Sequence, residues 1–556
     1  MRSRPPVHRA LRIAVGLGLL AFLAAFYFHP LFSILRLSLA PDGRLEAAAA
    51  VEVLSEAYVW RLVGFTTWQA TLSTALTLAL GLPVAYVFAR YDFPGKQTLR
   101  AVTAVPFVLP TVVVAAAFLA LLGNGGVINR WLQAALQLEA GPLRLERTLW
   151  IVLLAHAFYN LGVVVRTVGG FWSNMGSELE EAAAVLGAGP WRRFSHVTLP
   201  LLLPSIAAAS LLVFLFCFTS FGVMLILGGL RYSTLETEIY RQTIAFFDLP
   251  AAAVLALLQL VITFGVMVAY TRLQARTSVT LALQPSRHTS RPPAGIWRRL
   301  MVAAVVIALS AFVLTPLLTL AWRSLTLGGE MTLVYYRELG VNRLGSAFFV
   351  PPGEAVWNSL RFALTATGLS LALGVTGAYM VAGRRSGWRT LLDPILLLPL
   401  GTSAVTLGLG YVVAMGNLRA STALIPAAHT LIAMPFVVRA ILPALRGLDQ
   451  RLRDAAAVLG AGPVRAWRQV DLPILWPAVV VGAAFAFTIS MGEFGATLLI
   501  SRPETQTMPV VIYRALSRPG QLNYGQALAM STILMAVCAA AIVIIERFRF
   551  RDIGEF

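Results

Sequence analysis

The sequence predicts an all-α polytopic membrane protein with about twelve transmembrane helices in two parallel six-helix repeats. Three observations carry this prediction: an apolar composition, a series of apolar stretches of helical length, and an internal repeat. Of the 556 residues, 58% are hydrophobic and 12% are charged, and the mean hydropathy is +0.76. Soluble proteins carry about 25% charged residues. The composition therefore excludes an ordinary soluble enzyme and predicts a chain embedded in a lipid bilayer.

Twelve stretches approach the length of about 20 apolar residues that a membrane-spanning helix needs. An N-terminal basic segment precedes an apolar run that continues to about Leu39, and we interpret this run as an uncleaved first helix rather than a signal peptide. The predicted spans are 13–35, 66–89, 99–122, 148–170, 201–228, 250–271, 300–322, 357–382, 391–415, 421–445, 474–500 and 526–545.

The basic residues predict which side of the membrane each loop faces. Cytoplasmic loops carry an excess of Lys and Arg. If the N-terminus is cytoplasmic, most of the 44 basic residues fall in the cytoplasmic loops and the two tails. The sequence therefore predicts that both termini are cytoplasmic. The net charge of +19 is then a topology signal, and no nucleic-acid partner is expected.

An internal repeat divides the chain into two halves. At an offset of 273 residues, His156 matches His429, and the register continues without gaps through the following loop and span. Six spans in each copy make the repeats parallel, because an odd number would invert them. We therefore predict a first transmembrane domain at 1–272, a cytoplasmic linker at 273–297 and a second transmembrane domain at 298–556.

One predicted cytoplasmic loop in each half, at 178–200 and 447–473, has the same unusual composition. An acidic residue followed by alanines favours a helix whose N-terminal turn carries negative charge. A Gly-Ala-Gly-Pro segment then ends that helix, and a Leu-Pro pair begins the next span. The matched residues are Glu181, Ala182, Ala183, Gly187, Leu199 and Pro200 in the first copy, and Asp454, Ala455, Ala456, Gly460, Leu472 and Pro473 in the second.

This pattern of E-A-A, three residues, G, nine residues and I/V-x-L-P resembles the cytoplasmic coupling loop of permeases of binding-protein-dependent ABC importers. Both copies fit it, the second with Asp454 in place of Glu. The resemblance covers nearly the whole chain, which is similar to the fused, single-chain permeases of thiamine and ferric-iron importers. It implies a duplicated type I ABC importer permease fold in a bacterial plasma (inner) membrane.

The resemblance also implies the partners and the solute. Two copies of an ABC ATPase subunit would dock on the two loops, and a periplasmic or lipid-anchored substrate-binding protein would deliver the solute. The solute would be thiamine or its phosphates, or ferric iron. The chain would need no cofactor of its own, because the partner ATPase would bind ATP-Mg.

The sequence contains no phosphate-binding loop of the form G-x-x-x-x-G-K-[ST]. That loop needs a lysine before Ser or Thr, and the only lysine, Lys96, precedes Gln97. Nucleophile and metal motifs are absent from the sequence as well, so we expect no catalytic residues, no metal site and no enzyme activity in this chain. Two alternatives to an importer permease stay open, namely a secondary transporter driven by an ion gradient and a membrane-embedded enzyme.

Ser220 and Glu493 are predicted to line a translocation pathway. They occupy matching positions in the fifth and eleventh spans, and an acid inside a membrane is a functional-site hypothesis by default. Only one half carries the acid, so the pair breaks the two-fold symmetry, as recognition of an asymmetric solute requires. The alternative is a helix-to-helix hydrogen bond from a neutral Glu493. His156 and His429 are also expected to bond helix to helix.

Two further pairs of matching features have less specific interpretations. Arg166 and Arg439 lie toward the cytoplasmic ends of equivalent spans, where they are expected to reach the headgroup layer or their own coupling loop. The segments 227–250 and 500–525 are polar, aromatic and predicted to lie outside the membrane. They either receive the substrate-binding protein or serve as solvated connectors.

Overall fold

A computed structural model of the chain describes residues 6–40, 47–175, 178–277, 290–341, 350–382, 387–416, 418 and 421–552. Within these ranges the structure is helical apart from loops and one short hairpin of β1 (Thr326–Leu327) and β2 (Glu330–Met331). The same ranges hold 11 helices that are long and apolar enough to cross a membrane, or 12 if a bent pair counts as one span. This confirms the prediction of an all-α polytopic fold. Helices satisfy every backbone group internally, as a bilayer requires.

The first half contains the helices up to residue 277. In chain order they are α1 (Pro6–Leu23), η1 (Ala24–Phe28), α2 (His29–Leu39), α3 (Ala47–Ser55), α4 (Ala57–Arg90), α5 (Lys96–Val102), α6 (Val105–Val108), α7 (Thr111–Leu122), α8 (Val127–Ala135), α9 (Leu149–Asn174), α10 (Glu178–Val185), α11 (Pro190–Arg193), η2 (Phe194–Thr198), α12 (Leu199–Phe218), η3 (Met224–Gly228), η4 (Leu230–Tyr232), α13 (Leu235–Ile244) and α14 (Leu249–Thr277).

The second half repeats this order. Its helices are α15 (Ile296–Ser324), α16 (Val334–Arg337), η6 (Glu338–Gly340), α17 (Pro352–Ala382), α18 (Gly387–Leu397), η7 (Leu398–Gly401), α19 (Ala404–Ala414), α20 (Leu424–Gly447), α21 (Gln450–Val458), α22 (Pro463–Ala466), η9 (Trp467–Asp471), α23 (Leu472–Gly492), α24 (Gly495–Ile500), η10 (Pro503–Thr505), α25 (Met508–Leu516) and α26 (Gln521–Asp552).

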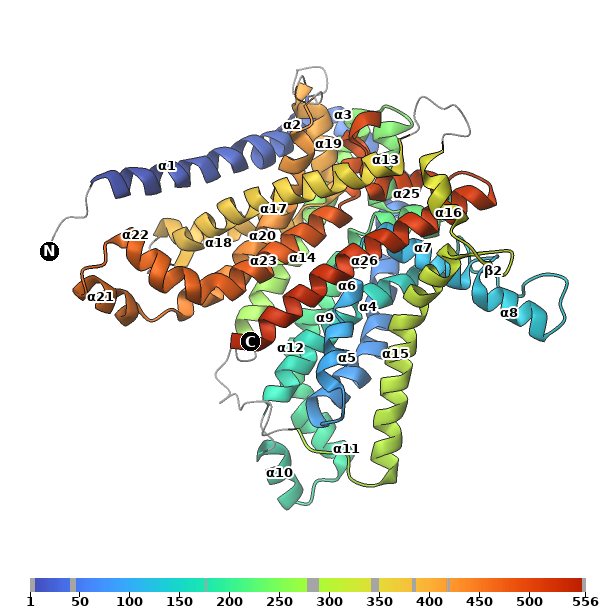
Figure 1. Ribbon diagram of the computed structural model, residues 1–556, viewed down its shortest axis with the longest axis horizontal. Coiled ribbons are helices and arrows are strands. Elements are labelled where there is room, and N and C mark those ends of the chain that lie inside the picture. Colours follow the sequence, from blue (N-terminus) through green and yellow to red (C-terminus); the bar gives the residue numbers. More distant parts are fainter. Residues whose placement is uncertain are drawn as a thin grey trace.

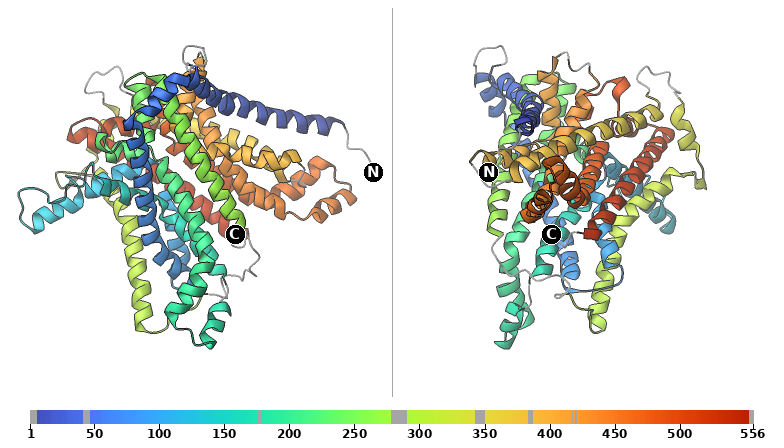
Figure 2. Two further views of the ribbon diagram at one scale, coloured as in Figure 1. Left: turned by 180° about the vertical axis from the view of Figure 1, so that it is seen from behind. Right: turned by 60° about the vertical axis from the view of Figure 1, so that its left-hand side comes forward.

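The two halves form two arms that diverge from a common region (Figure 1). In the first arm α4, α9 and α12 run toward α10 and α11, and in the second arm α17, α20 and α23 run toward α21 and α22. The views in Figure 2 show the same divergence from two other directions. The predicted coupling loops therefore occupy the free ends of the arms. The beginning of α1 lies near the end of the second arm, and the end of α26 lies between the two arms.

The halves exchange their first helices. The first-half helices α1 and α2 pack on α17 and α19, whereas the second-half helix α15 packs on α4 and α7. Within each arm, glycine permits close packing at equivalent places. A Cβ atom at Gly81 would lie 2.8 Å from Val164 Cγ1, and one at Gly374 would lie 2.7 Å from Val437 Cγ1. Such small residues are typical of helix interfaces in membranes.

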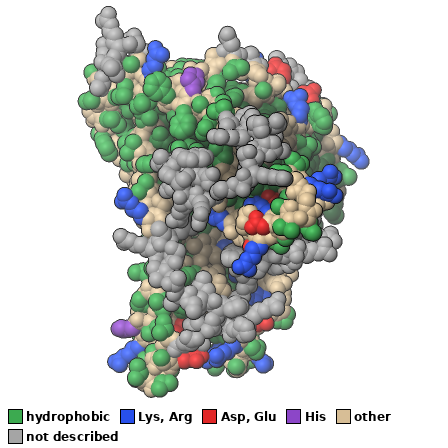
Figure 3. All heavy atoms as spheres, turned by 90° about the vertical axis from the view of Figure 1, so that its left-hand side faces the viewer, with side chains coloured by type: hydrophobic (Ala, Val, Ile, Leu, Met, Phe, Trp, Pro, Cys, Tyr) green, Lys and Arg blue, Asp and Glu red, His purple; other side chains and the backbone are tan. Residues whose placement is uncertain are grey.

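Large apolar side chains also point outward from the bundle. Leu17, Phe32, Val261 and Leu318 are each at least 60% exposed. Figure 3 shows the face toward which α21 and α22 point, where hydrophobic side chains gather in the upper part and charged side chains are scattered elsewhere. The exposed apolar side chains of the long helices fit contact with lipid rather than water.

Some predicted boundaries are wrong. The third predicted span, 99–122, is broken into α5, α6 and α7, and the span-forming helix begins at Thr111. Pro110 directly precedes that helix and has the extended backbone that interrupts it. The ninth predicted span, 391–415, bends by 96° between Gly401 and Ala404. Of the predicted linker 273–297, α14 covers the beginning, to Thr277, and α15 starts at Ile296, while 278–289 lie outside the described residues.

Candidate translocation pathway and coupling segments

The predicted fifth and eleventh spans are interrupted at equivalent positions. The sequence predicted continuous helices at 201–228 and 474–500, but α12 ends at Phe218 and α23 ends at Gly492, each followed by a short second helix. Glu493 therefore lies at a break and not inside a helix, which corrects the prediction. Backbone groups freed by such a break at membrane depth need side-chain partners or a cavity, and binding sites of transporters are built this way.

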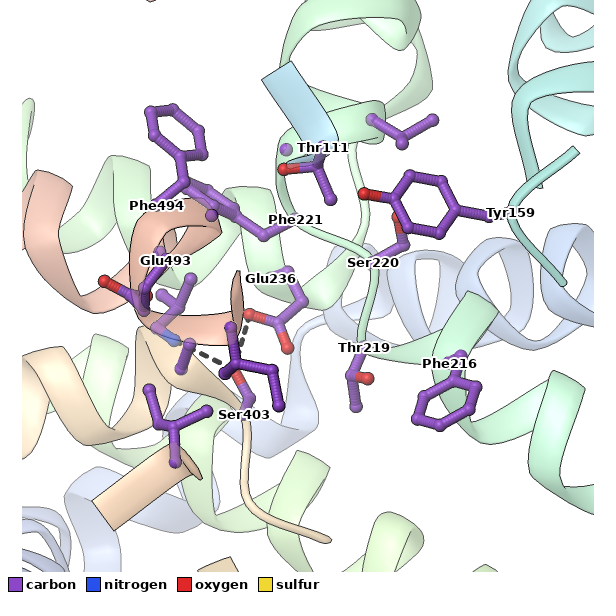
Figure 4. Close-up of a pocket in the computed structure, with 18 of the residues that line it drawn as sticks. Thr111, Tyr159, Phe216, Thr219, Ser220, Phe221, Glu236, Ser403, Glu493 and Phe494 are labelled. Atoms are coloured by element: carbon purple, nitrogen blue, oxygen red, sulfur yellow. Dashed lines mark hydrogen bonds between the residues drawn. The ribbon is translucent and has the colours of Figure 1, made fainter. Parts of the chain in front are cut away.

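A cavity of about 330 Å³ lies between the two halves, beside both breaks (Figure 4). Its wall includes both residues that the sequence predicted for the pathway, Ser220 and Glu493. Aromatic rings, hydroxyl groups and two carboxylates share the wall. A volume of this size lies at the lower end of the range for small-molecule pockets.

Glu493 bonds to the amides at the N-terminal end of α24 and also contacts α20. Its Oε1 accepts a hydrogen bond of 2.8 Å from the Ala496 amide, and its Oε2 accepts one of 3.0 Å from the Thr497 amide and another from the Thr497 hydroxyl. His429 Nε2 lies 3.3 Å from Oε2. The carboxylate, one residue before the N-cap Phe494, thus satisfies the first amides of α24, where the helix dipole favours negative charge. Its hydrogen-bonding capacity is largely used by the protein itself.

The two matched histidines join helices, as the sequence predicted. His156 on α9 bonds to Ser73 on α4 at 2.9 Å through Nδ1, and to Ser220 at the first break at 2.8 Å through Nε2. His429 on α20 bonds to Ser490 at 2.7 Å and to Thr497 at 2.8 Å. The helix-to-helix interpretation is confirmed for both. Each histidine ties the centre of its arm to the neighbouring break.

The sequence prediction missed a second acid in the cavity, Glu236. The segment around it was expected outside the membrane, but Glu236 is fully buried at the beginning of α13 and lines the cavity. Its Oε2 accepts a 2.7 Å hydrogen bond from the Ser403 hydroxyl, and its Oε1 accepts one from the Gln259 amide. The solvated-connector interpretation is therefore wrong for this part of 227–250. The repeat could have pointed to Glu236, because the matching residue in the second half, 273 positions further on, is Pro509. An acid at this position therefore occurs in one half only, as at Glu493.

Four aromatic rings form a ladder across the boundary between the halves, in the order Tyr240, Phe221, Phe494 and Tyr513. Successive ring centroids are 5.4, 5.5 and 5.4 Å apart, and the two phenylalanines are stacked. The ladder is symmetric, because the two tyrosines and the two phenylalanines are matched by the repeat. Its tyrosines lie on α13 and α25, on the side of the molecule away from the predicted coupling loops (Figure 1). The ladder therefore bounds the cavity on that side.

The predicted coupling loops have matching backbones. In both, a short helix ends at a glycine with a left-handed backbone, with φ of +82° at Gly187 and +81° at Gly460. This confirms the local structure predicted from the Gly-Ala-Gly-Pro segment. A Cβ atom at either glycine would meet nothing within 4 Å. A side chain there would strain the backbone but would not clash with the rest of the chain.

Each of the two loops exposes a matched pair of apolar residues that the sequence pattern did not single out. Val185 and Leu186 are 89% and 88% exposed, and Val458 and Leu459 are both 88% exposed. Of the residues predicted for coupling, the exposed ones are Glu181, Ala182, Gly187, Pro200, Asp454, Ala455, Gly460 and Pro473, and the half-buried ones are Ala183, Leu199, Ala456 and Leu472. Each loop thus presents an apolar tip that no part of the described chain covers.

The two loops are anchored differently. In the first, the Glu180 carboxylate accepts hydrogen bonds from Arg90 on α4 and from the Thr198 hydroxyl, the latter at 2.7 Å. In the second, Arg453 and Asp471 form a pair with two hydrogen bonds of 2.8 Å. The hydrogen bond from Arg453 to Asp471 raises the pKa of the Arg453 guanidinium. Both anchors hold the loop against the beginning of the next span.

The two matched arginines of the arms lie outside the cavity wall. Arg166 is half-buried on α9, and Arg439 is exposed on α20. Neither is brought to Ser220 or Glu493 at the cavity. Their placement fits the expectation of a role at the membrane boundary or at the coupling loops rather than in the pathway.

Comparisons with known proteins cover nearly the whole chain. Residues 77–279 match the family of binding-protein-dependent transport system inner membrane components. The chain is 27% identical over 516 residues to the thiamine transport system permease protein ThiP of Escherichia coli (strain K12), covering 90% of this chain and 91% of that protein. It is 29% identical to ThiP of Brucella abortus (strain 2308), with 96% and 95% covered. It is 26% identical to a probable ABC transporter permease protein, y4fN, of Sinorhizobium fredii, with 96% of each covered.

Proposed function

We propose that this chain, which is a permease subunit of a binding-protein-dependent ABC importer and not an enzyme, carries thiamine across the inner membrane through the cavity at the two helix breaks. The family match and the full-length similarity to permeases confirm the importer class, and the ion-gradient alternative is not favoured. A permease of this class works with a separate ATPase, which binds ATP-Mg, and with a substrate-binding protein.

The choice of thiamine rests on the names of the relatives and on the chemistry of the cavity. Thiamine combines an aromatic pyrimidine with a cationic thiazolium ring. The cavity wall offers aromatic rings and the carboxylates Glu236 and Glu493, and aromatic faces and carboxylates both attract organic cations. No lysine or arginine belongs to this wall of described residues, so a phosphate group would find no cationic partner there. This favours thiamine over its phosphates.

Ferric iron is less well supported. Fe³⁺ needs several carboxylate, imidazole or thiolate ligands. In the described part of the chain, no three His, Cys, Asp or Glu side chains come together as such a group. The names of the two ThiP relatives and of y4fN do not mention iron.

The two coupling segments, 178–200 and 447–473, support docking of two ATPase subunits. They lie at the ends of separate arms, share one backbone shape and expose matched Val-Leu tips. An apolar side chain on a protruding tip gains most by entering a groove of another protein. Two equivalent tips therefore fit two copies of one partner.

Alternating access follows from this geometry. The arms are apart on the coupling side, and the aromatic ladder joins the halves on the other side. ATPase subunits that bind ATP more tightly in a closed pair would bring the two coupling segments together and separate Phe221 from Phe494. The cavity would then open toward the binding protein. The beginning of α1 and the end of α26 lie on the coupling side, which supports cytoplasmic termini.

The test is uptake into vesicles that contain this permease with its ATPase and its binding protein. We expect ATP-dependent accumulation of radiolabelled thiamine that stops when the ATPase or the binding protein is omitted. Thiamine pyrophosphate should compete poorly. Uptake that continues without the ATPase and follows an ion gradient would overturn the assignment.

A further inference from the structure

We propose that Glu236 is the group that recognises the positive charge of the solute, and that it exchanges its hydrogen bond with Ser403 for a contact with the cationic part of the solute. This inference rests on the proposed function, because it takes the cavity between the halves as the solute pathway.

Glu236 and Ser403 bring the two halves together at the cavity. Glu236 begins α13 in the first half, whereas Ser403 caps α19 in the second half and accepts hydrogen bonds from the amides of Val405 and Thr406 at 3.1 and 3.3 Å. The Ser403 hydroxyl hydrogen is donated to Glu236 at 2.7 Å. Figure 4 shows the two side chains facing one another, joined by a dashed line. Both line the cavity, so a solute there can reach the carboxylate.

The protein places no positive charge beside Glu236 to stabilise an ionised carboxylate. Within the described chain, no lysine or arginine nitrogen lies within 4.0 Å of its carboxylate, and its hydrogen-bond donors Ser403 and Gln259 are both neutral. The other amide atom of Gln259, Oε1, is buried without a hydrogen-bond partner in the described structure, which adds a second acceptor nearby. A buried carboxylate with neutral donors is costly in a membrane. A cation in the cavity would remove that cost.

Glu493 is a weaker candidate for the same role, although it lines the same cavity. Two amides at the beginning of α24, the Thr497 hydroxyl and His429 already surround its carboxylate. A solute that took over Glu493 would uncap α24. Glu236 can exchange a single hydroxyl contact without unfolding any helix.

The repeat shows that the fold itself does not require the Glu236–Ser403 pair. α13 packs on α19, and in the other half α25 packs on α7 in the equivalent way. At that equivalent contact, Pro509 takes the place of Glu236, and Pro110 takes the place of Ser403 before the helix. Two prolines thus suffice for the same helix contact. The acid and the hydroxyl are an addition to one side of the pathway, where an asymmetric cation would bind.

The experiment compares two probes that differ in charge. One probe is thiamine, and the other is an analogue in which a neutral thiophene replaces the thiazolium ring. Binding is measured to the permease–ATPase complex in lipid nanodiscs without the binding protein, because the binding protein also selects its ligand. ATP-driven uptake with the binding protein is measured in parallel.

We expect the unaltered complex to bind thiamine at least tenfold more tightly than the neutral analogue. Glu236→Gln should reduce that ratio to near one by weakening thiamine binding, and Glu236→Asp should retain a reduced preference. Ser403→Ala should keep the preference, because the charge remains. Glu238→Gln is the matched control, since Glu238 is a buried acid on the same helix that bonds to Tyr58 and Arg241 and is not part of the cavity wall.

An unchanged preference in Glu236→Gln would overturn the inference, while continued thiamine uptake would leave the proposed function intact. If the unaltered complex neither binds nor transports thiamine, the proposed solute is wrong. Labelling of Glu236 by dicyclohexylcarbodiimide then tests whether the carboxylate binds a cation. Protection by N-methylthiazolium but not by neutral thiazole would support a cation site at Glu236. Equal labelling of Glu236 in the presence of N-methylthiazolium and of neutral thiazole would overturn the inference. The labelling also serves if Glu236→Gln fails to assemble.

Discussion

The two coupling segments share one backbone but are fastened to their arms with opposite charges. Glu180 in the first segment and Arg453 in the second occupy matching positions, and so do Thr198 and Asp471. In the first segment the acid, Glu180, lies on the short helix and accepts a hydrogen bond from Arg90 on α4. The second segment places the base on the short helix and the acid at the beginning of the next span.

This difference separates what a partner contacts from what the arm supplies. The left-handed glycine and the exposed Val-Leu tip are the same in both segments, and they face away from the chain. The anchor lies on the inner side, where any well-paired set of donors and acceptors holds the loop in place. We therefore infer that the shape of the tip is constrained by one kind of partner, whereas the anchor is free to differ.

The largest expected effect comes from the shared glycines. Gly187→Val and Gly460→Val should each reduce ATP-dependent uptake at least tenfold, because a β-branched residue resists a positive φ by about 1–2 kcal/mol and would reshape the tip. Uptake assays with each single variant, with membrane levels of the permease as a control, measure this. A severe loss in one segment with full uptake in the other would show that the two segments are not equivalent.

The exposed leucines should matter for the partner and not for the fold. Leu186→Ala and Leu459→Ala should each weaken binding of the ATPase roughly fivefold to thirtyfold, since a truncated apolar anchor at an interface costs about 1–2 kcal/mol. The melting temperature of the isolated permease should not change. Titration of the ATPase onto the permease in nanodiscs gives the affinity, and unaltered affinity in both variants would place the docking surface elsewhere.

We expect that the first segment can take the charge arrangement of the second, with a base on the short helix and an acid at the beginning of the next span. Glu180→Arg alone should lower uptake several-fold, because two arginines would then face each other at Arg90. Adding Thr198→Asp supplies the acid of the second segment, and we expect this double variant to recover at least half of the lost uptake. A double variant that is no better than Glu180→Arg would show that the polarity of the anchor is fixed by something beyond local pairing.

The smallest effect concerns stability. Asp471→Ala leaves Arg453 without its paired carboxylate and should lower the free energy of unfolding by about 1–2 kcal/mol, since Arg453 is partly exposed. Thr198→Ala removes one hydroxyl hydrogen bond and should cost about 0.5–1 kcal/mol. Thermal unfolding of the permease in detergent checks the order of the two. The reverse order would mean that the first anchor carries more of the stability than its contacts indicate.

The parts of the fold that the sequence predicted depend on local properties. The length of each apolar stretch predicted the number of spans, and the spacing of the repeat located both proposed coupling segments and their left-handed glycines. The prediction failed where a span is broken. An averaged hydropathy does not register that Pro110 and Glu493 interrupt helices, because their neighbours are as apolar as those in a continuous span.

The sequence alone therefore determined that this is a duplicated helical membrane protein, because apolar length and repeat spacing are written along the chain. Only the tertiary structure decided which polar side chains meet. Glu236 and Ser403 are 167 residues apart, and they touch because α13 of one half packs on α19 of the other. Helices in lipid are brought together by close packing of small side chains and by interhelical hydrogen bonds. The position of the cavity, and the acid that faces it, follow from that packing.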